Sequence, residues 1–403
     1  MKILILFFTS IIFISCNGKT ADRNTDIDSI EELDLYSDCM NYENRLSSIA
    51  TDVRIIPLCN EPLLNDFHIY DIETCRDNIF ISGINCIYKY DINGNFICNI
   101  GTAGMGPEEY INIYPPIEID RVNDIIYVSD AGKQTIILYD FNGKYIRSIP
   151  LEKTGCIKLI TPDIIALRET TSDRLSENCS LISFIDTKGT ITNSYKSNIY
   201  PLNYQPKNLG PDASFLWGDK DHYYYLEYGS DTIFQITDNT IKPIRYLTGS
   251  HKMLQDEYSN TESNTKLAIL SYILRPNAAI FESDENILFK LINDAETYYK
   301  VYNKATKEYA RTFYKNAATI NRSKCKRMDF FIDDILTGEN FNPQYQSEGK
   351  MIAFISSEKI CNNKEQIIDR IKLKSKTDYT DLINAITNLT EYDNSFVMIA
   401  DLK

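Results

Sequence analysis

One motif recurs along this chain and limits what the chain can fold into. The motif Tyr90-Asp91-x-x-Gly94 returns as Tyr139-Asp140-x-x-Gly143 and as Ile185-Asp186-x-x-Gly189, in steps of 49 and 46 residues from one aspartate to the next. In each copy the Asp carboxylate can accept a hydrogen bond from the backbone two residues on, and Gly tolerates the left-handed conformation of a tight turn. Alternating strand patterns lie on both sides of every copy, so the motif predicts a repeated β-hairpin.

The first copy also begins like the calcium loop of an EF-hand, since Asp91 is followed by Asn93. An EF-hand loop needs Gly at its sixth position and a bidentate Glu at its twelfth. Here Gly94 stands at the fourth position and Thr102 at the twelfth. The spacing therefore favours a turn over a calcium site.

The repeats predict a β-propeller. Another short strand precedes each hairpin, and two weaker copies follow around Asp238 and Asn303. A four-stranded unit that returns every forty-odd residues is typical of a propeller blade. Five blades are predicted at about 66–100, 111–150, 155–198, 214–248 and 278–315.

A sixth, composite blade would close the ring. It would take strands from 351–356 and 395–402, with its outer strand from 53–58, and so remove an open sheet edge. The sequence thus predicts an all-β fold, a six-bladed β-propeller of four-stranded antiparallel blades closed by N- and C-terminal strands. Two helical insertions are expected, at about 252–274 and around an apolar stripe from Tyr379 to Leu389, which should dock on the rim.

The N-terminus predicts export. Lys2 and the apolar run 3–14 are typical of a signal peptide, too short to span a bilayer. Ser15-Cys16 resembles the lipobox of bacterial lipoproteins, although Phe13 stands where Leu is usual. We therefore assign residues 1–15 to a lipoprotein signal peptide, Cys16 to lipid attachment, 16–50 to an acidic tether and 51–403 to the propeller.

Charge and cysteine content exclude some partners. The net charge is -14 without a basic cluster, which argues against nucleic acid and against a polybasic membrane patch. The ten cysteines leave nine once Cys16 is acylated, and no C-x-x-C motif occurs. Most are expected to be buried free thiols, so no disulfide pair is assigned. We expect a monomer.

The glycine-rich stretch after the first hairpin resembles a phosphate cradle at Gly101, Gly104 and Gly106. A cradle needs the N-terminus of a helix behind it, but the sequence there continues as Pro-Glu-Glu-Tyr and cannot begin a long helix. Glu108 and Glu109 would also repel an anion. The glycines are therefore interpreted as a passage from one sheet to the next.

With these residues in place, the chain resembles the six-bladed β-propeller lipoproteins of gut bacteria, a family distantly similar to NHL-type propellers. The resemblance rests on IPL at Ile56, the exit loop NIGTAGMGPEEY, the DTIFQI segment from Asp231 and the closing YDNSFVMIADLK. It covers roughly residues 50–403, with Glu108 where the family often has Gly. It implies a propeller on an exported lipoprotein, and it transfers no catalytic residue.

Enzyme signatures are weak. Some NHL-type propellers hold a channel metal with His and Asp, but this chain has only His68, His222 and His251, at most one per blade. Adjacent carboxylates such as Asp333-Asp334 point to opposite faces of a strand, and no G-x-S-x-G motif occurs. No cofactor is predicted. A structural calcium ion in the channel is compatible with the composition, but no motif indicates it.

Aromatic residues give the best binding candidate. The stretch 215–228 holds the only tryptophan, Trp217, with Asp219, Tyr223 and three further tyrosines, and such faces suit sugars or peptides. Packing between blades is the alternative for these rings. With Glu108 and Glu109, they form the predicted ligand-binding set.

The sequence therefore predicts a non-enzymatic binding module for a peptide, glycan or protein, lipid-anchored in the cell envelope, at the outer membrane. Its exposure to the periplasm or to the cell surface stays open. The alternative is a channel-metal-dependent hydrolase or lyase of NHL-propeller type.

Overall fold

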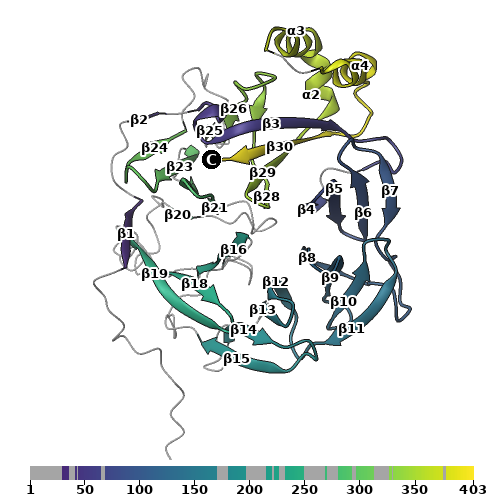
Figure 1. The fold of residues 1–403 in the computed structure, drawn as a ribbon, viewed down its shortest axis with the longest axis vertical. Coiled ribbons are helices and arrows are strands. Elements are labelled where there is room, and N and C mark those ends of the chain that lie inside the picture. Colours follow the sequence, from purple (N-terminus) through teal and green to yellow (C-terminus); the bar gives the residue numbers. More distant parts are fainter. Residues whose placement is uncertain are drawn as a thin grey trace, which may run out of the picture.

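The computed structural model describes residues 30–35, 41–42, 44–64, 69–169, 180–196, 215–219, 222–226, 232–248, 268–269, 280–292, 296–312, 326–328, 330–374 and 378–403. These residues form six antiparallel blades arranged in a closed ring around a central axis (Figure 1). We call the region between the inner strands of the blades the channel. In each blade the first strand lies next to the channel and the last strand lies at the rim (Figure 1). The predicted six-bladed β-propeller is confirmed.

Blades 1 to 3 each use four consecutive strands. Blade 1 contains β4 (Ile69–Cys75), β5 (Asn78–Gly83), β6 (Cys86–Asp91) and β7 (Phe96–Asn99). Blade 2 contains β8 (Ile113–Asp120), β9 (Ile125–Asp130), β10 (Thr135–Asp140) and β11 (Tyr145–Pro150). Blade 3 contains β12 (Gly155–Thr161), β13 (Ile164–Glu169), β14 (Ser180–Ile185) and β15 (Ile191–Lys196).

Blades 4 to 6 are built with additions. Blade 4 contains β16 (Phe215–Asp219), β17 (His222–Leu226), β18 (Thr232–Thr237) and β19 (Thr240–Thr248). Blade 5 contains β20 (Ala268–Ile269), β21 (Ile280–Glu282), β22 (Asn286–Ile292), β23 (Glu296–Asn303), β24 (Tyr309–Arg311) and β25 (Lys326–Met328). Blade 6 contains β28 (Tyr345–Ser347), β29 (Lys350–Ile355), β30 (Phe396–Leu402) and β3 (Ala50–Pro57). The short strands β26 (Phe331–Ile332) and β27 (Asn340–Phe341) form a separate pair.

The recurring motif forms the predicted turns. Asp91 Oδ1 accepts hydrogen bonds from the backbone N–H groups of Asn93 and Asn95, both at 2.9 Å. Asp140 and Asp186 repeat these contacts in blades 2 and 3. Gly94 has φ +85°, and a Cβ there would lie 1.9 Å from the Pro57 carbonyl oxygen. The hairpin prediction is confirmed at all three copies, since only glycine fits this conformation and this approach.

Both ends of the sequence close the ring at blade 6. Strand β3 pairs with β30 along its whole length, from Ala50 opposite Leu402 to Pro57 opposite Phe396. It is the outermost strand of a sheet whose other three strands come from the C-terminal part (Figure 1). The composite blade is therefore confirmed.

The structure corrects the predicted tether at residues 16–50. Strand β1 (Glu31–Asp34) lies parallel to β19, and β2 (Asn41–Tyr42) lies parallel to β24, before the 3-10 helix η2 (Leu46–Ser48). Leu33 and Leu46 are fully buried. The acidic composition of this segment favoured the tether prediction, because its few leucines are isolated in the sequence. In the structure the blades bury Leu33 and Leu46. The described residues from 30 to 50 therefore belong to the fold, and we call residues 30–35 the clasp.

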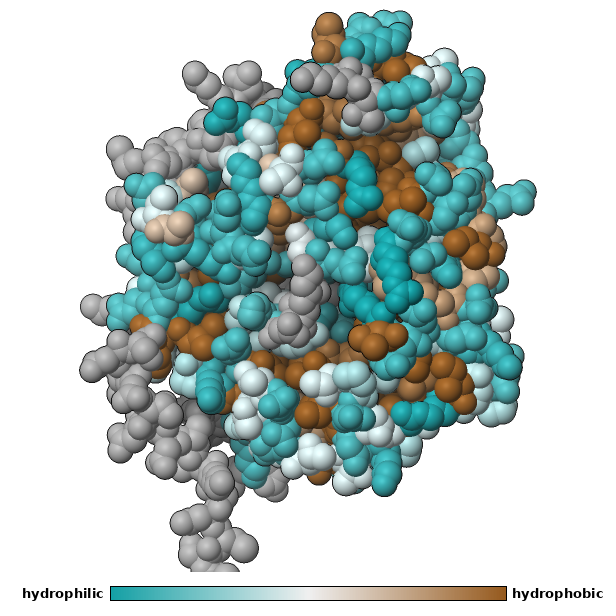
Figure 2. Space-filling model, viewed as in Figure 1, coloured by the Kyte–Doolittle hydropathy of each residue, from teal (hydrophilic) through white to brown (hydrophobic). Residues whose placement is uncertain are grey.

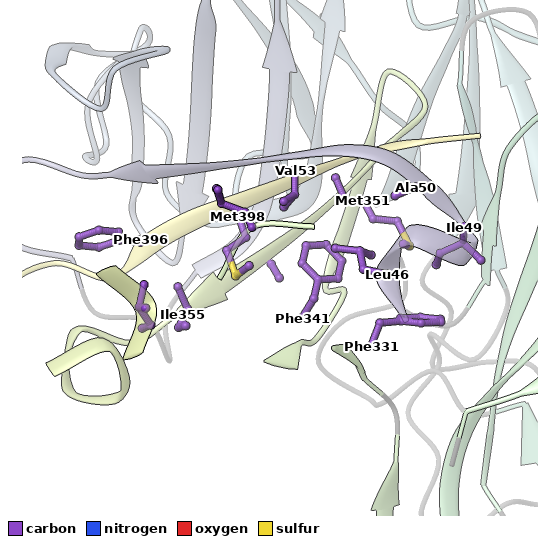
Figure 3. Close-up of a cluster of buried hydrophobic side chains, with 14 of the residues drawn as sticks. Leu46, Ile49, Ala50, Val53, Phe331, Phe341, Met351, Ile355, Phe396 and Met398 are labelled. Atoms are coloured by element: carbon purple, nitrogen blue, oxygen red, sulfur yellow. The ribbon is translucent and has the colours of Figure 1, made fainter. Parts of the chain in front are cut away.

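The hydrophobic core is divided among the interfaces between neighbouring blades. Its largest part joins blades 5 and 6, where Leu46 and Val53 meet Phe341 and Met398 (Figure 3). The face of the ring in Figure 2 is mostly hydrophilic, with hydrophobic side chains gathered towards the helical insertion. Six cysteines among the described residues are free thiols, and two of them, Cys75 and Cys156, are buried.

Three helices lie between β29 and β30: α2 (Ser357–Asn362), α3 (Lys364–Lys374) and α4 (Thr380–Asn388). Leu382 and Ile386 of α4 are buried against the same core as β3, which confirms the predicted docking stripe. Helices α2 and α3 were not predicted from the sequence. None of the helices in the described ranges is long and apolar enough to cross a membrane.

The prediction of a helix at 252–274 is wrong for the two residues of this segment that the structure describes, 268 and 269. Ala268 and Ile269 form strand β20, which pairs with Ile292 and Leu291 of β22. This pairing depends on a partner more than twenty residues away, and local periodicity carries no information about it. The rest of that segment lies outside the described residues.

Candidate functional site

The glycine-rich loop between β7 and β8 is held together by its own groups. The Gly106 N–H donates to Glu109 Oε2 at 2.7 Å, and Lys133 Nζ donates to the carbonyl oxygens of Gly106 and Glu109. A Cβ on Gly104 would lie 2.0 Å from Glu109 Oε2. The glycines thus close the loop around the Glu109 carboxylate, while the Glu108 side chain is exposed.

The aromatic candidates lie in the interior. Trp217 is 6 % exposed and packs against Tyr224, with ring centroids 5.6 Å apart, in the core that also contains Leu33 of the clasp. Tyr223 faces blade 3, where Lys158 Nζ lies 6.0 Å from its ring. Asp219 ends β16, and its side chain lies outside the described residues. The five predicted residues form two groups, one on the β16–β17 pair and one in the β7–β8 loop, and their role in ligand binding stays a prediction.

The inner strands of the ring carry a charged cluster that was not predicted from the sequence. Lys158 Nζ on β12 pairs with Glu118 Oε1 on β8 at 2.9 Å. Arg121, just after β8, pairs with Glu73 of β4 at 3.1 Å and with Glu348, just after β28, at 3.2 Å. Ion pairs thus join blades 1, 2, 3 and 6 across the channel.

A second cluster joins the remaining blades. Glu282 on β21 pairs with Arg245 of β19 and with Lys304 after β23, at 2.9 Å each. Gln346 Nε2 on β28 donates to the Glu282 carbonyl oxygen at 2.6 Å. Arg245 also pairs with Glu31 of the clasp at 3.1 Å. Each blade therefore contributes to a polar network that holds the ring together.

Burial shifts the pKa values in the first cluster. Burial raises the pKa of Glu73 to about 7, although Arg121 and Lys158 oppose the rise. The pKa of Asp71 lies well above its usual value because the group is buried and because Glu73 and Glu118 are close. Burial alone would lower the pKa of Lys158, but Glu118 and Glu73 raise it above its usual value. Burial therefore favours the protonated form of both carboxyl groups, those of Asp71 and Glu73.

These groups do not fit a metal ion. No cluster of three or more His, Cys, Asp or Glu side chains suited to a metal occurs among the residues that the structure describes. Glu73, Glu118 and Glu282 each already face a lysine or arginine in hydrogen-bonded contact. His222 is exposed at the start of β17, and the other two histidines lie outside the described residues. The donor set therefore gives no support to the channel-metal alternative.

A sequence signal for the channel cluster existed. Asp71 and Glu73 alternate with Ile72 and Thr74 in the first strand of blade 1, and Glu118 occupies the first strand of blade 2. Charged residues at alternate positions of a strand that is otherwise apolar point to a polar face inside the fold. The partner cations could not be assigned, because they come from other blades.

A different surface lies at the end of the ring where the inner strands begin. The segments 58–64, 100–112 and 389–395 all emerge there, and we call this the loop end. Three large hydrophobic side chains on these segments are more than half exposed: Leu63 is 67 % exposed, Met105 87 % and Tyr392 80 %. Such residues are costly to expose, so a group of them at one end of the ring indicates an interaction surface.

Hydrogen bonds hold these segments in place. The Asn394 side chain accepts from the Leu64 N–H at 2.7 Å and donates to the carbonyl oxygens of Cys59 and Pro62 at 2.6 and 2.9 Å. Asp130, which is fully buried, accepts from the N–H groups of Ile111 and Asn112. The loop end is thus preorganised.

The ring of six blades and the closed polar channel define the protein as a six-bladed β-propeller. The chain belongs to the family described as a domain of unknown function, DUF4934, whose model matches residues 30–401. No curated protein matches the sequence. The family match begins at the clasp, in agreement with the corrected boundary of the fold.

Several solved structures are similar to this chain. A presumed exported protein of Bacteroides fragilis is 15 % identical, with a TM-score of 0.64, over 93 % of this chain and 99 % of that chain. A DUF4221 protein of Bacteroides vulgatus is 13 % identical, with a TM-score of 0.44, over 88 % and 97 %. Virginiamycin B lyase from Staphylococcus aureus is 13 % identical, with a TM-score of 0.42, over 87 % and 99 %. At these identities the likeness concerns the fold.

Proposed function

We propose that this protein is an exported, lipid-anchored binding module that holds a partner protein or peptide at its loop end. The observation that carries the proposal is the set of exposed hydrophobic side chains, Leu63, Met105 and Tyr392, on segments fixed by partly buried hydrogen bonds. A surface that is rigid before binding loses little conformational entropy on binding, and this favours affinity. Export and anchoring are supported by the signal peptide pattern and the Ser15-Cys16 lipobox.

A binding role agrees with the channel as well. The charged groups of the channel form ion pairs with one another, and these ion pairs connect the blades of the ring. Rigid blades that carry fixed loops are the usual means by which propellers make recognition surfaces.

The test is a variant that removes the hydrophobic surface and leaves the ring intact. Leu63→Ser, Met105→Ser and Tyr392→Ser are combined in the full chain, expressed in its own cells and treated with a chemical crosslinker. We expect the crosslinked adduct of the wild-type chain to disappear in the triple variant, since apolar contact supplies most of such an interface.

Val122→Ser is the matched control. Val122 is 82 % exposed, but it lies in the β8–β9 turn at the opposite end of the ring. The control should keep the adduct. An adduct that persists in the triple variant, or that is absent from the wild type, would contradict the proposal, provided that circular dichroism shows the same fold for every chain.

A further inference from the structure

The segments of the loop end carry charge of one sign. Segments 58–64, 100–112 and 389–395 contain five acidic residues and neither lysine nor arginine, although the chain as a whole has 42 Lys and Arg among its 403 residues. The acidic residues are Glu61, Glu108, Glu109, Glu391 and Asp393. The exposed hydrophobic side chains of this surface therefore stand among carboxylates.

Two of the five carboxylates bind groups of the loops themselves. Glu109 accepts from the Gly106 N–H at 2.7 Å. Asp393 accepts from the Thr390 N–H at 2.6 Å and from Asn60 Nδ2 at 2.7 Å. These two carboxylates therefore hold the segments in shape.

The other three carboxylates, those of Glu61, Glu108 and Glu391, belong to exposed residues. Within the described ranges, none of the three accepts a hydrogen bond or forms an ion pair. Two lysines reach the loop end from neighbouring elements, but the Nζ groups of Lys133 and Lys364 donate to backbone carbonyl oxygens there. The three exposed carboxylates are thus open to the cations of a partner.

The exposed carboxylates lie close to the exposed hydrophobic side chains. Glu61 is two residues before Leu63, and Glu391 directly precedes Tyr392. Hydrogen bonds of Asn394 join the two segments that carry these pairs. The loop between β7 and β8 repeats the combination, with an exposed glutamate three residues after an exposed methionine. A partner that covers the hydrophobic side chains would therefore also meet the carboxylates.

This combination selects the chemistry of the partner. An anionic surface would place like charges beside the three carboxylates, which is strongly unfavourable. A purely apolar surface would remove water from the carboxylates without giving them a counter-charge. Lysine and arginine side chains pair with carboxylates and at the same time lay their apolar stems on hydrophobic neighbours. A tyrosine ring also attracts a cation.

We propose that the partner held at the loop end is a protein or peptide segment in which lysine or arginine residues alternate with large apolar residues. This inference rests on the binding role proposed for the loop end and adds the chemistry of the partner to it. Apolar side chains of the partner would contact Leu63, Met105 and Tyr392, while its cations would pair with the three exposed carboxylates. Attraction between the opposite charges would also speed the encounter at low salt.

The test measures the binding of labelled peptides to the purified full chain by fluorescence anisotropy. Three peptides of equal length alternate Lys with Leu, Glu with Leu, or Lys with Ser. We expect the Lys–Leu peptide to bind most tightly, and to bind more weakly as the salt concentration rises. Combining Glu61→Gln, Glu108→Gln and Glu391→Gln should weaken its affinity about tenfold, since three exposed ion pairs are lost.

A variant with Asp77→Asn, Asp163→Asn and Asp238→Asn is the matched control, because it loses the same number of charges from exposed turns at the opposite end of the ring. It should bind the Lys–Leu peptide as the wild type does, and both variants should melt at the wild-type temperature. The inference is overturned if no peptide binds, or if the Glu–Leu or Lys–Ser peptide binds as tightly as the Lys–Leu peptide. It is also overturned if the two variants have the same affinity for the Lys–Leu peptide.

Crosslinking in cells separates this inference from the proposed function. If the adduct is lost when the three hydrophobic side chains are replaced but persists when the three carboxylates are replaced, the binding role stands and the cationic partner is wrong. If the wild-type chain gives no adduct, the binding role itself is wrong. An adduct that both sets of substitutions weaken supports both proposals.

Discussion

At the scale of single residues, burial inside the ring changes the pKa of a carboxyl group, that of Glu73. Glu73 is 5 % exposed and accepts from Ser347 Oγ at 2.6 Å and from Arg121 at 3.1 Å, yet burial outweighs both contacts and raises its pKa to about 7. The folded chain therefore binds this proton more tightly than the unfolded chain does. Such a group stabilises the fold at low pH, and the stabilisation is lost as the pH rises through the folded pKa.

We expect the protein to resist urea better at pH 5 than at pH 8. The raised pKa of Glu73, about 7 against an ordinary 4.5, contributes up to about 3 kcal/mol to this difference. Glu73→Gln removes the titrating proton and keeps the shape, so its urea midpoint should change less between the two pH values. Unfolding followed by fluorescence at both pH values measures this.

Glu152→Gln, an exposed control, should retain the pH dependence of the wild type. If the urea midpoint of Glu73→Gln changed between pH 5 and pH 8 as much as that of the wild type, Glu73 would not be the cause of the pH dependence. Asp71, whose pKa is raised by the same burial, would be the next group to substitute.

At the scale of elements, the clasp is the feature that links most parts. Strand β1 adds to β19 in parallel, Leu33 enters the core between blades 4 and 5, and Glu31 reaches Arg245, which in turn holds Glu282 beside the channel. A short parallel strand on an edge is weak by itself. Its side chains, more than its backbone bonds, hold it in place.

We expect Leu33→Ala to lower the free energy of unfolding by about 2–5 kcal/mol, since a fully buried leucine is removed from a packed core. Glu32→Ala, one position away on the exposed face of the same strand, should change it by less than about 0.5 kcal/mol. Denaturant unfolding compares the two. Equal effects would mean that the clasp lies on the blades without stabilising them.

The elements also show what the sequence could reveal. The hairpins at Asp91, Asp140 and Asp186 were predictable because their chemistry is local, with a carboxylate and a glycine within three residues. The clasp, strand β20 and the pairing of Lys158 with Glu118 depend on partners from other blades. The periodicity of one segment contains no information about contacts with another segment. The ion pairs between blades were therefore not predicted, and the predicted tether extended too far along the sequence.

At the scale of the whole molecule, the predicted lipid anchor limits how far the fold can lie from a membrane. The sequence places Cys16, the cysteine predicted to carry a lipid, fourteen residues before the start of the clasp at residue 30. An extended chain spans at most about 3.5 Å per residue. A lipid on Cys16 would therefore keep blade 4 within about 50 Å of the membrane surface.

We expect the wild-type chain to incorporate labelled palmitate in growing cells and to sediment with membranes. Cys16→Ser should lose the label and leave the membrane fraction, because no acyl chain would remain to anchor it. Cys59→Ser, which changes a free thiol within the fold, should behave as the wild type does. Label on the Cys16→Ser chain would place the acylation elsewhere.

The closure of the ring has a consequence for how the protein is made. Ala50 pairs with Leu402, so one of the last strands to be synthesised must meet one of the first. Contacts between such distant positions form late, since the long loop between them must first be ordered. Blade 6 cannot form until nearly the whole chain has left the ribosome. We propose that this polypeptide crosses a membrane before it folds. The late pairing of β3 with β30 would then keep the propeller incomplete during export and allow it to close after export.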